Sequence, residues 1–422
     1  MIELDFTALS HAAEGIGRHS GRAVFVPFAL PGERVRVEIV DEKKTYARAV
    51  LREILTASPD RVRPRCPHHF ALDGASPEAR DLKSACGGCQ LQHLAYRSQL
   101  EFKRRVVAEQ LARMGGLQDP PVRPALASPA PFNYRNHVQF ALTPQGELGF
   151  RAANSHAIVP VRECHLLHPA LAVLFPYIRL ELGIELDYLS LRTGADDEAL
   201  VVFETGGEAP EVELDLPVSA ALLRPDGVSF AIADRADVTA AVRGRTFKVS
   251  AGSFFQVNTP VAEQMVDLVL AGLELRPGET LLDLYCGVGL FSAFAASTAG
   301  RVIGIEAYPP AVSDAAENLD EFDNVEIYEA TAEAVLQSLN LGIDAVVLDP
   351  PRAGCAPEVI DALIRLRPAR LVYASCDPAT LARDARRLGA GGYALDWAQP
   401  LDMFPQTYHV ECVARFTRLA QP

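Results

Sequence analysis

The stretch Leu281–Ser292, LLDLYCGVGLFS, decides the fold of the C-terminal half of this chain. Its mostly apolar start predicts a short buried strand, which runs into Gly287 and Gly289 before a helix that is expected to begin around Phe291. Glycines in such a turn let a ligand approach the backbone closely, and the N-terminus of the helix adds favourable polarity. The stretch therefore predicts a ligand-binding strand–turn–helix unit, with a tight turn that binds nothing as the alternative.

Three more apolar runs follow at helix-length intervals: RVIGIE (301–306), DAVVLD (344–349) and RLVYASC (370–376). This alternation predicts a Rossmann-like domain of βαβ units with buried parallel strands. Glu306 follows Gly287 by 19 residues, at the end of the second strand, where an acidic side chain receives ribose hydroxyls.

Ser292 stands where a dinucleotide site would have a third glycine. The pattern D-x-x-x-G-x-G, which begins at Asp283, therefore favours an S-adenosylmethionine methyltransferase over a dinucleotide enzyme.

Two further residues with chemical potential stand at the ends of later strands. Asp349, in LDPPRAG, is expected to face the same crevice as Gly287, although Asp-Pro-Pro is also ordinary turn chemistry. Cys376 lies between a strand end and a helix that Asp377 would cap, with Pro378 at its first position. The positive end of that helix predicts a lowered thiol pKa and a nucleophilic thiolate; a buried structural cysteine is the alternative.

Glu411 lies in the otherwise apolar run YHVECVARF, near the C-terminus. A carboxylate there is either paired, or kept with a raised pKa for proton transfer, or solvated on an edge strand.

A methyl-donor fold with a thiolate and carboxylates at one crevice indicates a specific reaction, the methylation of carbon 5 of uracil. Carbon 5 of uracil becomes nucleophilic only after a thiolate adds to carbon 6, and a base must then remove the carbon-5 proton.

The C-terminal half closely resembles the class I RNA (uracil-5-)-methyltransferases, through FFQVN (254–258), DLYCGVG, LDPPRAG, SCDPATLARD and LDMFPQTYHVE. The resemblance implies Cys376 as nucleophile and Glu411 as base. It further implies an S-adenosylmethionine site that includes Gln256, Tyr285, Gly287, Gly289, Leu290, Glu306, Thr331 and Asp349. Gln256 and Asp349 would also line the uracil. Leu290 replaces an Asn or Thr of many relatives, so that side-chain contact is lost, and Thr331 is expected near the adenine.

Residues 1–58 predict several short strands, with a Pro31–Gly32 turn between AVFVPFAL and ERVRVEIV. A small OB-like barrel is expected, and the segment resembles a TRAM domain, an RNA-binding barrel. Its cations and aromatic residues are candidates for RNA contact, or else an ordinary solvated face over core aromatics: Arg18, Arg22, Arg34, Arg36, Lys43, Lys44, Arg48, Phe25, Phe28 and Tyr46. Residues 95–114 predict a helix that Gly115 and Gly116 close.

Four cysteines form a second pattern. Cys66, Cys86 and Cys89 read C-x19-C-G-G-C, and Cys164 follows after 74 residues. In a reducing compartment this pattern predicts a four-thiolate site for zinc or an iron–sulfur cluster, with free thiols as the alternative. The family resemblance favours [4Fe–4S]. Relatives have about five residues in the first gap, so Cys66 is the least certain ligand, with His68 and His69 as substitutes.

Composition sets the outer limits. The 422 residues are 49% hydrophobic and 22% charged, as in soluble globular proteins, and no apolar run is long enough to span a membrane. No secretory signal is visible and eight cysteines are too few for a disulfide scaffold, so a cytoplasmic location is expected. The net charge is −14, but residues 1–110 hold 17 Lys and Arg against 14 Asp and Glu, which leaves the front half mildly basic.

The sequence thus predicts a multidomain α/β protein: a TRAM barrel (1–58), a mixed α+β central domain with the cysteines (59–245) and a methyltransferase domain (246–422). The expected product is 5-methyluridine in RNA. Ribosomal RNA, of the 23S type, is favoured over transfer RNA because bacterial enzymes for the latter usually lack both a TRAM domain and the cysteines. No obligatory protein partner is evident. The rivals are a methyltransferase of exocyclic nitrogen or protein, and a non-catalytic iron–sulfur RNA-binding protein.

Overall fold

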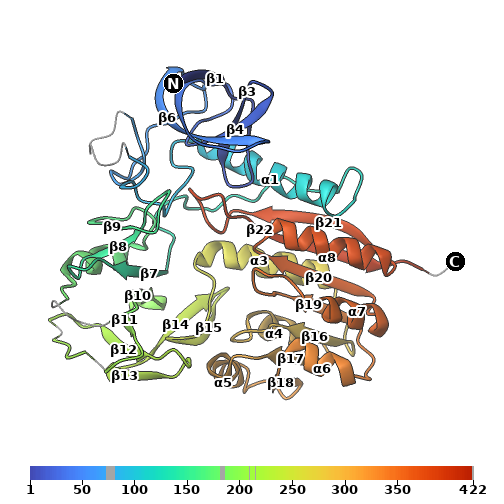
Figure 1. The fold of residues 1–422 in the computed structure, drawn as a ribbon. Coiled ribbons are helices and arrows are strands. Elements are labelled where there is room, and N and C mark those ends of the chain that lie inside the picture. The colour runs from blue at the N-terminus through green and yellow to red at the C-terminus, as the bar shows by residue number, and fades with distance from the viewer. Residues whose placement is uncertain (73–80, 181–185, 209, 214, 421–422) are drawn as a thin grey trace.

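The computed structural model describes residues 1–72, 81–180, 186–208, 210–213 and 215–420. Figure 1 shows three sheets in different parts of the molecule, with a small N-terminal sheet at the top, a mixed sheet at the lower left and a helix-covered sheet at the right. The predicted multidomain α/β organisation is therefore confirmed.

The N-terminal sheet is an OB-like barrel with strand order β1-β5-β6-β4-β3-β2. Its strands are β1 (Ile2–Asp5), β2 (Ala8–Leu9), β3 (Glu14–His19), β4 (Arg22–Pro27), β5 (Arg34–Glu42) and β6 (Tyr46–Thr56). The predicted turn between β4 and β5 is present, and Gly32 adopts a φ of +83° there, a conformation that glycine tolerates without strain. Alternate residues of β4, β5 and β6 point inward and form the barrel core.

Helix α1 (Tyr96–Arg113) matches the helix predicted from residues 95–114, and Gly116 follows it with a φ of +68°. The helix lies between the barrel and the C-terminal hairpin β21–β22 (Figure 1). Two of its polar side chains, Gln99 and Lys103, are fully buried, so the helix packs against polar partners as well as apolar ones.

The central sheet has seven strands in the order β13-β12-β11-β10-β7-β8-β9. These are β7 (His137–Leu142), β8 (Leu148–Arg151), β9 (Ile158–Pro160), β10 (Tyr188–Thr193), β11 (Ala199–Glu204), β12 (Ser219–Leu223) and β13 (Ser229–Ala233), with the short helices α2 (Pro169–Leu174), η2 (Phe175–Tyr177) and η3 (Ala195–Asp197). Strands β7 and β8 pair as an antiparallel hairpin. A separate hairpin, β14 (Asp237–Val242) and β15 (Arg245–Ser250), crosses the predicted limit at residue 245, so the domain limits stay a prediction.

The C-terminal sheet has seven strands in the order β18-β17-β16-β19-β20-β22-β21. Its strands are β16 (Thr280–Leu284), β17 (Arg301–Glu306), β18 (Val325–Glu329), β19 (Ala345–Leu348), β20 (Arg370–Ser375), β21 (Tyr393–Leu401) and β22 (Glu411–Arg418). The first five are parallel, as the apolar runs predict, whereas β22 is antiparallel to both β20 and β21. Strand order reverses between β16 and β19, and ligands of such sheets bind at the carboxyl ends beside this switch point.

Helices cover both faces of this sheet, which explains why its strands are apolar on both sides. One face packs on α3 (Thr259–Leu273), α4 (Leu290–Ala295) and α5 (Pro309–Asn318). The other packs on α6 (Ala332–Ser338), α7 (Pro357–Leu366), α8 (Pro378–Ala390) and the end of α1. No helix in the described ranges is both long enough and apolar enough to cross a membrane.

The turn after β16 generates a testable prediction. Gly289 has a φ of +90°, and a Cβ on it would lie 2.7 Å from Leu319 Cδ1, whereas Gly278, with a φ of +87°, has open space. Replacing Gly278 with Ala costs only backbone strain, about 1 kcal/mol. Gly289→Ala adds a clash with a buried side chain, so its melting temperature should fall further below that of the unmodified protein. Equal losses in thermal denaturation would contradict this account of the turn.

Candidate active site

Cys376 stands directly after β20, in the place that the sequence predicts. Asp377 caps α8 through its side chain, which accepts hydrogen bonds from Ala379 N (2.8 Å) and Thr380 N (3.0 Å), and Pro378 is the first helical residue. The Cys376 side chain is half-buried. The thiol is therefore held at the carboxyl edge of the sheet and is not part of the core, which argues against a merely structural cysteine.

The predicted lowering of the Cys376 pKa is wrong. Burial raises the pKa of this thiol to about 11, and the neighbouring carboxylates of Glu411 and Asp349 raise it further, against a smaller lowering by Arg352. The sequence-based argument considered only the helix N-terminus, because the carboxylates come from distant segments. Desolvation and like charge outweigh the helix end here.

Glu411 is the first residue of β22, and its side chain is buried. Strand β22 lies between β20 and β21, so the alternative of a solvated glutamate on an edge strand is wrong. Ser375 and Cys412 are the last pair in the antiparallel register of β20 and β22, and Cys376 and Glu411 are the residues next to this pair. The charge of Glu411 acts on the Cys376 thiol, so the two side chains are close in space. The sheet thus brings together two residues that are far apart in the sequence.

Asp349 follows β19 and is half-buried. Its pKa is raised by burial and by the negative charge of Asp283, and its own charge helps burial to raise the pKa of Glu411 well above the ordinary value. The exposed Arg352 lowers the pKa of both Glu411 and Cys376. The charges at the strand ends therefore act on one another: the pKa of Asp349 is raised to about 7, and that of Glu411 is raised well above its ordinary value.

The turn after β16 has the features of a ligand-binding turn. Tyr285 adopts a φ of +63°, which is uncommon for a residue other than glycine, and Gly287 follows with a φ of +55°. Glu306, at the end of β17, accepts hydrogen bonds from the backbone N of Gly287 (3.0 Å), Ala307 (2.8 Å) and Tyr308 (2.8 Å). Its carboxylate thus ties the turn to the neighbouring strand end, the predicted position for a ribose-binding acid.

Other predicted cofactor residues line the same sheet edge less directly. Thr331 caps α6 by accepting a hydrogen bond from Ala334 N at 3.3 Å. Glu333, in the first turn of α6, contributes to the raised pKa of Tyr285, so this helix start lies beside the turn. Leu290 is the first residue of α4, and its side chain is buried. Only its backbone could therefore make a polar contact with a cofactor.

Sequence reasoning did not assign Asp283 and Arg352 to the site. Asp283 is fully buried in β16, accepts a hydrogen bond from Ser292 Oγ at 2.7 Å, and has its pKa raised to about 7 by burial. Its Oδ1 has no hydrogen-bond partner among the described residues. An acidic residue inside an otherwise apolar strand was the available signal, because burying a carboxyl is costly unless it has a role.

The FFQVN segment leads into α3. Gln256 is buried, and Asn258 at the helix start donates to Ser128 Oγ (3.1 Å) and Met403 O (3.3 Å). Phe254, in contrast, is 64% exposed. The described contacts do not connect the Gln256 side chain with Cys376 or Glu411, so its place in the site stays a prediction.

Comparison with known proteins agrees with this geometry. Residues 232–418 match the family model described as tRNA (Uracil-5-)-methyltransferase, and residues 1–51 match the TRAM domain. An RNA methyltransferase of Streptomyces avermitilis is 38% identical over 98% of this chain and 97% of its own length, and one of Synechocystis is 35% identical over 98% and 94%. The chain belongs to the RNA (uracil-5-)-methyltransferase family.

A solved structure of similar architecture is that of the Pyrococcus abyssi tRNA (uracil-54, C5)-methyltransferase in complex with S-adenosyl-L-homocysteine. It is 29% identical, covers 99% of this chain and 100% of its own, and has a TM-score of 0.74. The protein is therefore an S-adenosylmethionine-dependent RNA methyltransferase, and the interpretation as a non-catalytic binding protein is wrong.

The four cysteines of this uracil-5-methyltransferase gather beside the central sheet. Each of Cys66, Cys86 and Cys89 has its pKa raised by burial and by the charge of Cys164, to about 11 for Cys66 and about 12 for Cys86. Gly88 N donates to Cys86 Sγ at 3.4 Å, and the backbone of His68 and His69 lowers the pKa of Cys66. Among the described residues, no three metal-binding side chains lie close enough together to hold a metal ion.

The histidines predicted as substitute ligands have other contacts. The buried ring of His69 lies 5.1 Å from Phe28 and 5.6 Å from His93, and burial lowers its pKa to about 4. His68 Nε2 accepts a hydrogen bond from Arg162 N at 3.3 Å. Part of the gap between Cys66 and Cys86, residues 73–80, lies outside the described residues.

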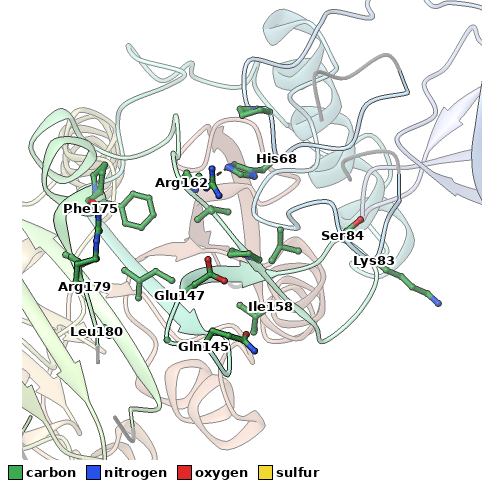
Figure 2. Close-up of a pocket in the computed structure, with 18 residues that line it drawn as sticks. His68, Lys83, Ser84, Gln145, Glu147, Ile158, Arg162, Phe175, Arg179 and Leu180 are labelled. Atoms are coloured by element: carbon green, nitrogen blue, oxygen red, sulfur yellow. Dashed lines mark hydrogen bonds between the residues drawn. The ribbon is translucent and has the colours of Figure 1, made fainter. Parts of the chain in front are cut away.

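A cavity of about 1270 Å³ lies near His68, Lys83 and Arg162 (Figure 2). It is lined by β8 and β9 and by the polar side chains of His68, Lys83, Glu147, Arg162 and Arg179. No residue predicted for catalysis lines it. The cavity is therefore separate from the sheet edge that carries Cys376.

The predicted RNA-contacting cations of the barrel are mostly paired with acids. Arg22, Arg34, Arg36, Lys43 and Arg48 form surface ion pairs, whereas Arg18 and Lys44 have none in the described part of the chain. The prediction that Phe28 is available for stacking is wrong, because it is buried and stacks on Phe70 at 4.8 Å. Phe25 and Tyr46 are half-buried neighbours, 6.0 Å apart.

The raised pKa of Cys376 generates a second prediction. Because only the thiolate is alkylated, the rate at which iodoacetamide modifies Cys376 should rise about tenfold per pH unit between pH 8 and pH 10. Mass spectrometry of the peptide that contains Cys376, in enzyme without substrate, measures this rate. A rate that is already constant above pH 8 would show that the helix N-terminus dominates after all.

Proposed function

We propose that this enzyme methylates carbon 5 of a uridine through a covalent bond between Cys376 and carbon 6 of the base. One observation supports the proposal: the antiparallel pairing of β20 and β22 ends beside Cys376 and the buried Glu411, and the charge of Glu411 acts on the Cys376 thiol. A nucleophile and a proton acceptor on two rigid strands, at the carboxyl edge of a methyltransferase sheet, are what this reaction needs.

The steps follow from the chemistry of uracil. The Cys376 thiolate adds to carbon 6, which moves the electron pair of the 5,6 double bond to carbon 5. Carbon 5 then takes the methyl group, which S-adenosylmethionine supplies as an electrophile. Glu411 removes the proton from carbon 5, the double bond forms again, and the carbon–sulfur bond breaks to release the thiolate.

The side chains at the strand ends support these roles. Burial and the charge of Asp349 raise the pKa of Glu411, which strengthens it as a proton acceptor once it is ionised. Arg352 lowers the pKa of Cys376 and so favours the thiolate. The cofactor would be held by eight residues at this sheet edge: Tyr285, Gly287, Gly289, Leu290, Glu306, Thr331, Gln256 and Asp349. The buried Oδ1 of Asp283, which lacks a partner among the described residues, fits a polar ligand at this edge.

We propose ribosomal RNA of the 23S type as the substrate, because the chain combines a TRAM domain with the four cysteines. The target uridine must leave its stack to expose both faces of the ring, so a loop is the expected site. The exposed ion pairs of the barrel are worth about 0–1 kcal/mol each, so RNA phosphates can replace the carboxylates at little cost. Transfer RNA is the second candidate, because the similar Pyrococcus abyssi protein is a tRNA methyltransferase.

The covalent mechanism predicts that RNA with 5-fluorouridine becomes trapped on the enzyme, because fluorine cannot leave as a proton does. With S-adenosylmethionine present, 23S ribosomal RNA transcripts should give an adduct that survives denaturing electrophoresis and maps to Cys376. Cys376→Ala should abolish both the adduct and the methylation of ordinary RNA.

The controls separate the alternatives. Glu411→Gln should still form the bond to ordinary RNA but release it slowly, so an adduct accumulates without fluorine. Methylation that survives Cys376→Ala would contradict the mechanism and favour attack by a nitrogen. Trapping of transfer RNA in place of ribosomal RNA would move the substrate to the second candidate.

We propose further that Cys66, Cys86, Cys89 and Cys164 hold a [4Fe–4S] cluster, with zinc as the alternative. The four thiols influence one another's pKa, and backbone N–H groups point at the sulfurs of Cys66 and Cys86, as expected for thiolate ligands. The segment directly after Cys89 bonds through Gln90 and Leu91 to the backbone of Gln406. A cluster on these cysteines would therefore have a structural role more than a catalytic one.

Metal content tests this proposal. Enzyme purified without oxygen should contain about four iron and four sulfide per chain by elemental and sulfide analysis, and the Cys86→Ser and Cys164→Ser variants should lose most of both. One zinc per chain in place of iron would favour the alternative. Loss in Cys86→Ser but not in Cys66→Ser would exclude Cys66 as a ligand.

A further inference from the structure

The loop of residues 402–410 joins β21 to β22 and leads directly into Glu411. Leu401 and Glu411, at the two ends of the loop, face each other in the register of the hairpin. Any displacement of this loop therefore moves the proposed base relative to Cys376. The loop also makes hydrogen bonds to residues outside it, so its position depends in part on what surrounds it.

Gln406 is a buried polar residue near the middle of this loop. Its side chain is 3% exposed, and its backbone adopts a φ of +69°, which is unusual for glutamine. Its carbonyl oxygen accepts hydrogen bonds from Gln90 N (3.1 Å) and Leu91 N (2.9 Å). The backbone that follows Cys89 therefore holds the loop at this point.

Gln99 of α1 forms a reciprocal pair with Gln406. Gln99 Nε2 donates to Gln406 Oε1 at 3.0 Å, and Gln406 N donates to Gln99 Oε1 at 3.1 Å. Gln99 Nε2 also donates to the carbonyl oxygens of Leu91 (3.1 Å) and Leu94 (2.8 Å). One buried amide thus joins helix α1, the segment after Cys89 and the loop.

Two further contacts hold the loop on either side of Gln406. The buried Lys103 pairs with Asp402, and its Nζ donates to Phe404 O at 3.0 Å. Tyr134 Oη donates to Pro405 O at 3.1 Å. The Lys103–Asp402 pair would leave a buried charge uncompensated if broken, so its loss would endanger the fold. The neutral Gln99–Gln406 pair can be changed at lower cost.

We propose that Gln99 and Gln406 are positioning residues that hold Glu411 opposite Cys376 for proton removal. This inference rests on the proposed function of Cys376 and Glu411. In the described part of the chain, neither side chain of the pair forms a hydrogen bond with Cys376 or Glu411, so the pair acts through the chain from Gln406 to Glu411. Its loss should slow the release of the methylated base while leaving RNA binding and the attack of the thiolate intact, because only proton removal needs Glu411.

The experiment measures kcat, KM for RNA and the amount of denaturation-resistant adduct with ordinary RNA. Gln99→Leu should lower kcat by on the order of tenfold to a hundredfold, the cost of a small misplacement of a reacting group, with KM unchanged. The covalent adduct should accumulate, because the carbon–sulfur bond forms but breaks slowly. Gln406→Asn is the second variant, in case Gln99→Leu does not fold. Asparagine suits the left-handed backbone, but its shorter side chain cannot reach both Gln99 and the carbonyl oxygen of Pro131, so the effect should be the same.

Asn324→Leu is the matched control. Asn324 Nδ2 donates to the carbonyl oxygens of Ala296 and Ala299, both at 2.9 Å. This variant therefore also removes a half-buried amide that bonds two backbone carbonyls, at a place with no described hydrogen bond to residues 402–410. It should leave the adduct at the level of the unmodified enzyme. The Gln99→Leu, Gln406→Asn double variant should lose no more kcat than the worse single variant, since residues that act as a unit are not additive.

Each outcome has one meaning. If Glu411→Gln gives no adduct with ordinary RNA, the proposed function of Glu411 fails. If Glu411→Gln accumulates the adduct but Gln99→Leu and Gln406→Asn do not, the positioning role is wrong while the function stands. An equal rise of the adduct in Asn324→Leu would show that general loosening of the protein is responsible, and this too would overturn the inference.

Discussion

The insertion of β22 between β20 and β21 is the constraint on which the active site depends. Strand β22 follows β21 in a hairpin and is antiparallel to both β21 and β20. Its register with β20 ends at the pair Ser375–Cys412, which leaves Glu411 next to Cys376. Shifting the register by one residue would turn Glu411 to the other face of the sheet. The backbone hydrogen bonds of the sheet therefore limit the spacing of the two residues that we propose as nucleophile and base.

Burial at this place has opposite effects on the two groups. It raises the pKa of the Glu411 carboxyl, which suits the proposed proton transfer, and it also raises the pKa of the Cys376 thiol, which keeps this thiol mostly protonated. Arg352 partly offsets both shifts. A thiol with a raised pKa reacts slowly with electrophiles at neutral pH, because little of it is thiolate. We expect its reactivity to rise when a bound ligand changes the charges around it.

The parts of the molecule outside the methyltransferase sheet also bear on that site. Helix α1 runs between the barrel and the β21–β22 hairpin (Figure 1) and carries Gln99 and Lys103 to the loop before Glu411. The segment after Cys89 bonds to the same loop through Gln90 and Leu91. The N-terminal half therefore supports the catalytic edge as well as offering surface to RNA.

The sequence by itself determined the parallel strands, the turn with Gly287 and Gly289, the Asp377 cap and the OB-like barrel, because each depends on the spacing of neighbouring residues. It also predicted the family, through motifs that are continuous in the chain. Only the tertiary structure decided the pKa of Cys376, the burial of Phe28 and the contacts of Gln406. These depend on charges and packing partners outside the local sequence, from Arg352, 24 residues before Cys376, to Gln99, 307 residues before Gln406. A local pattern carries no record of such partners.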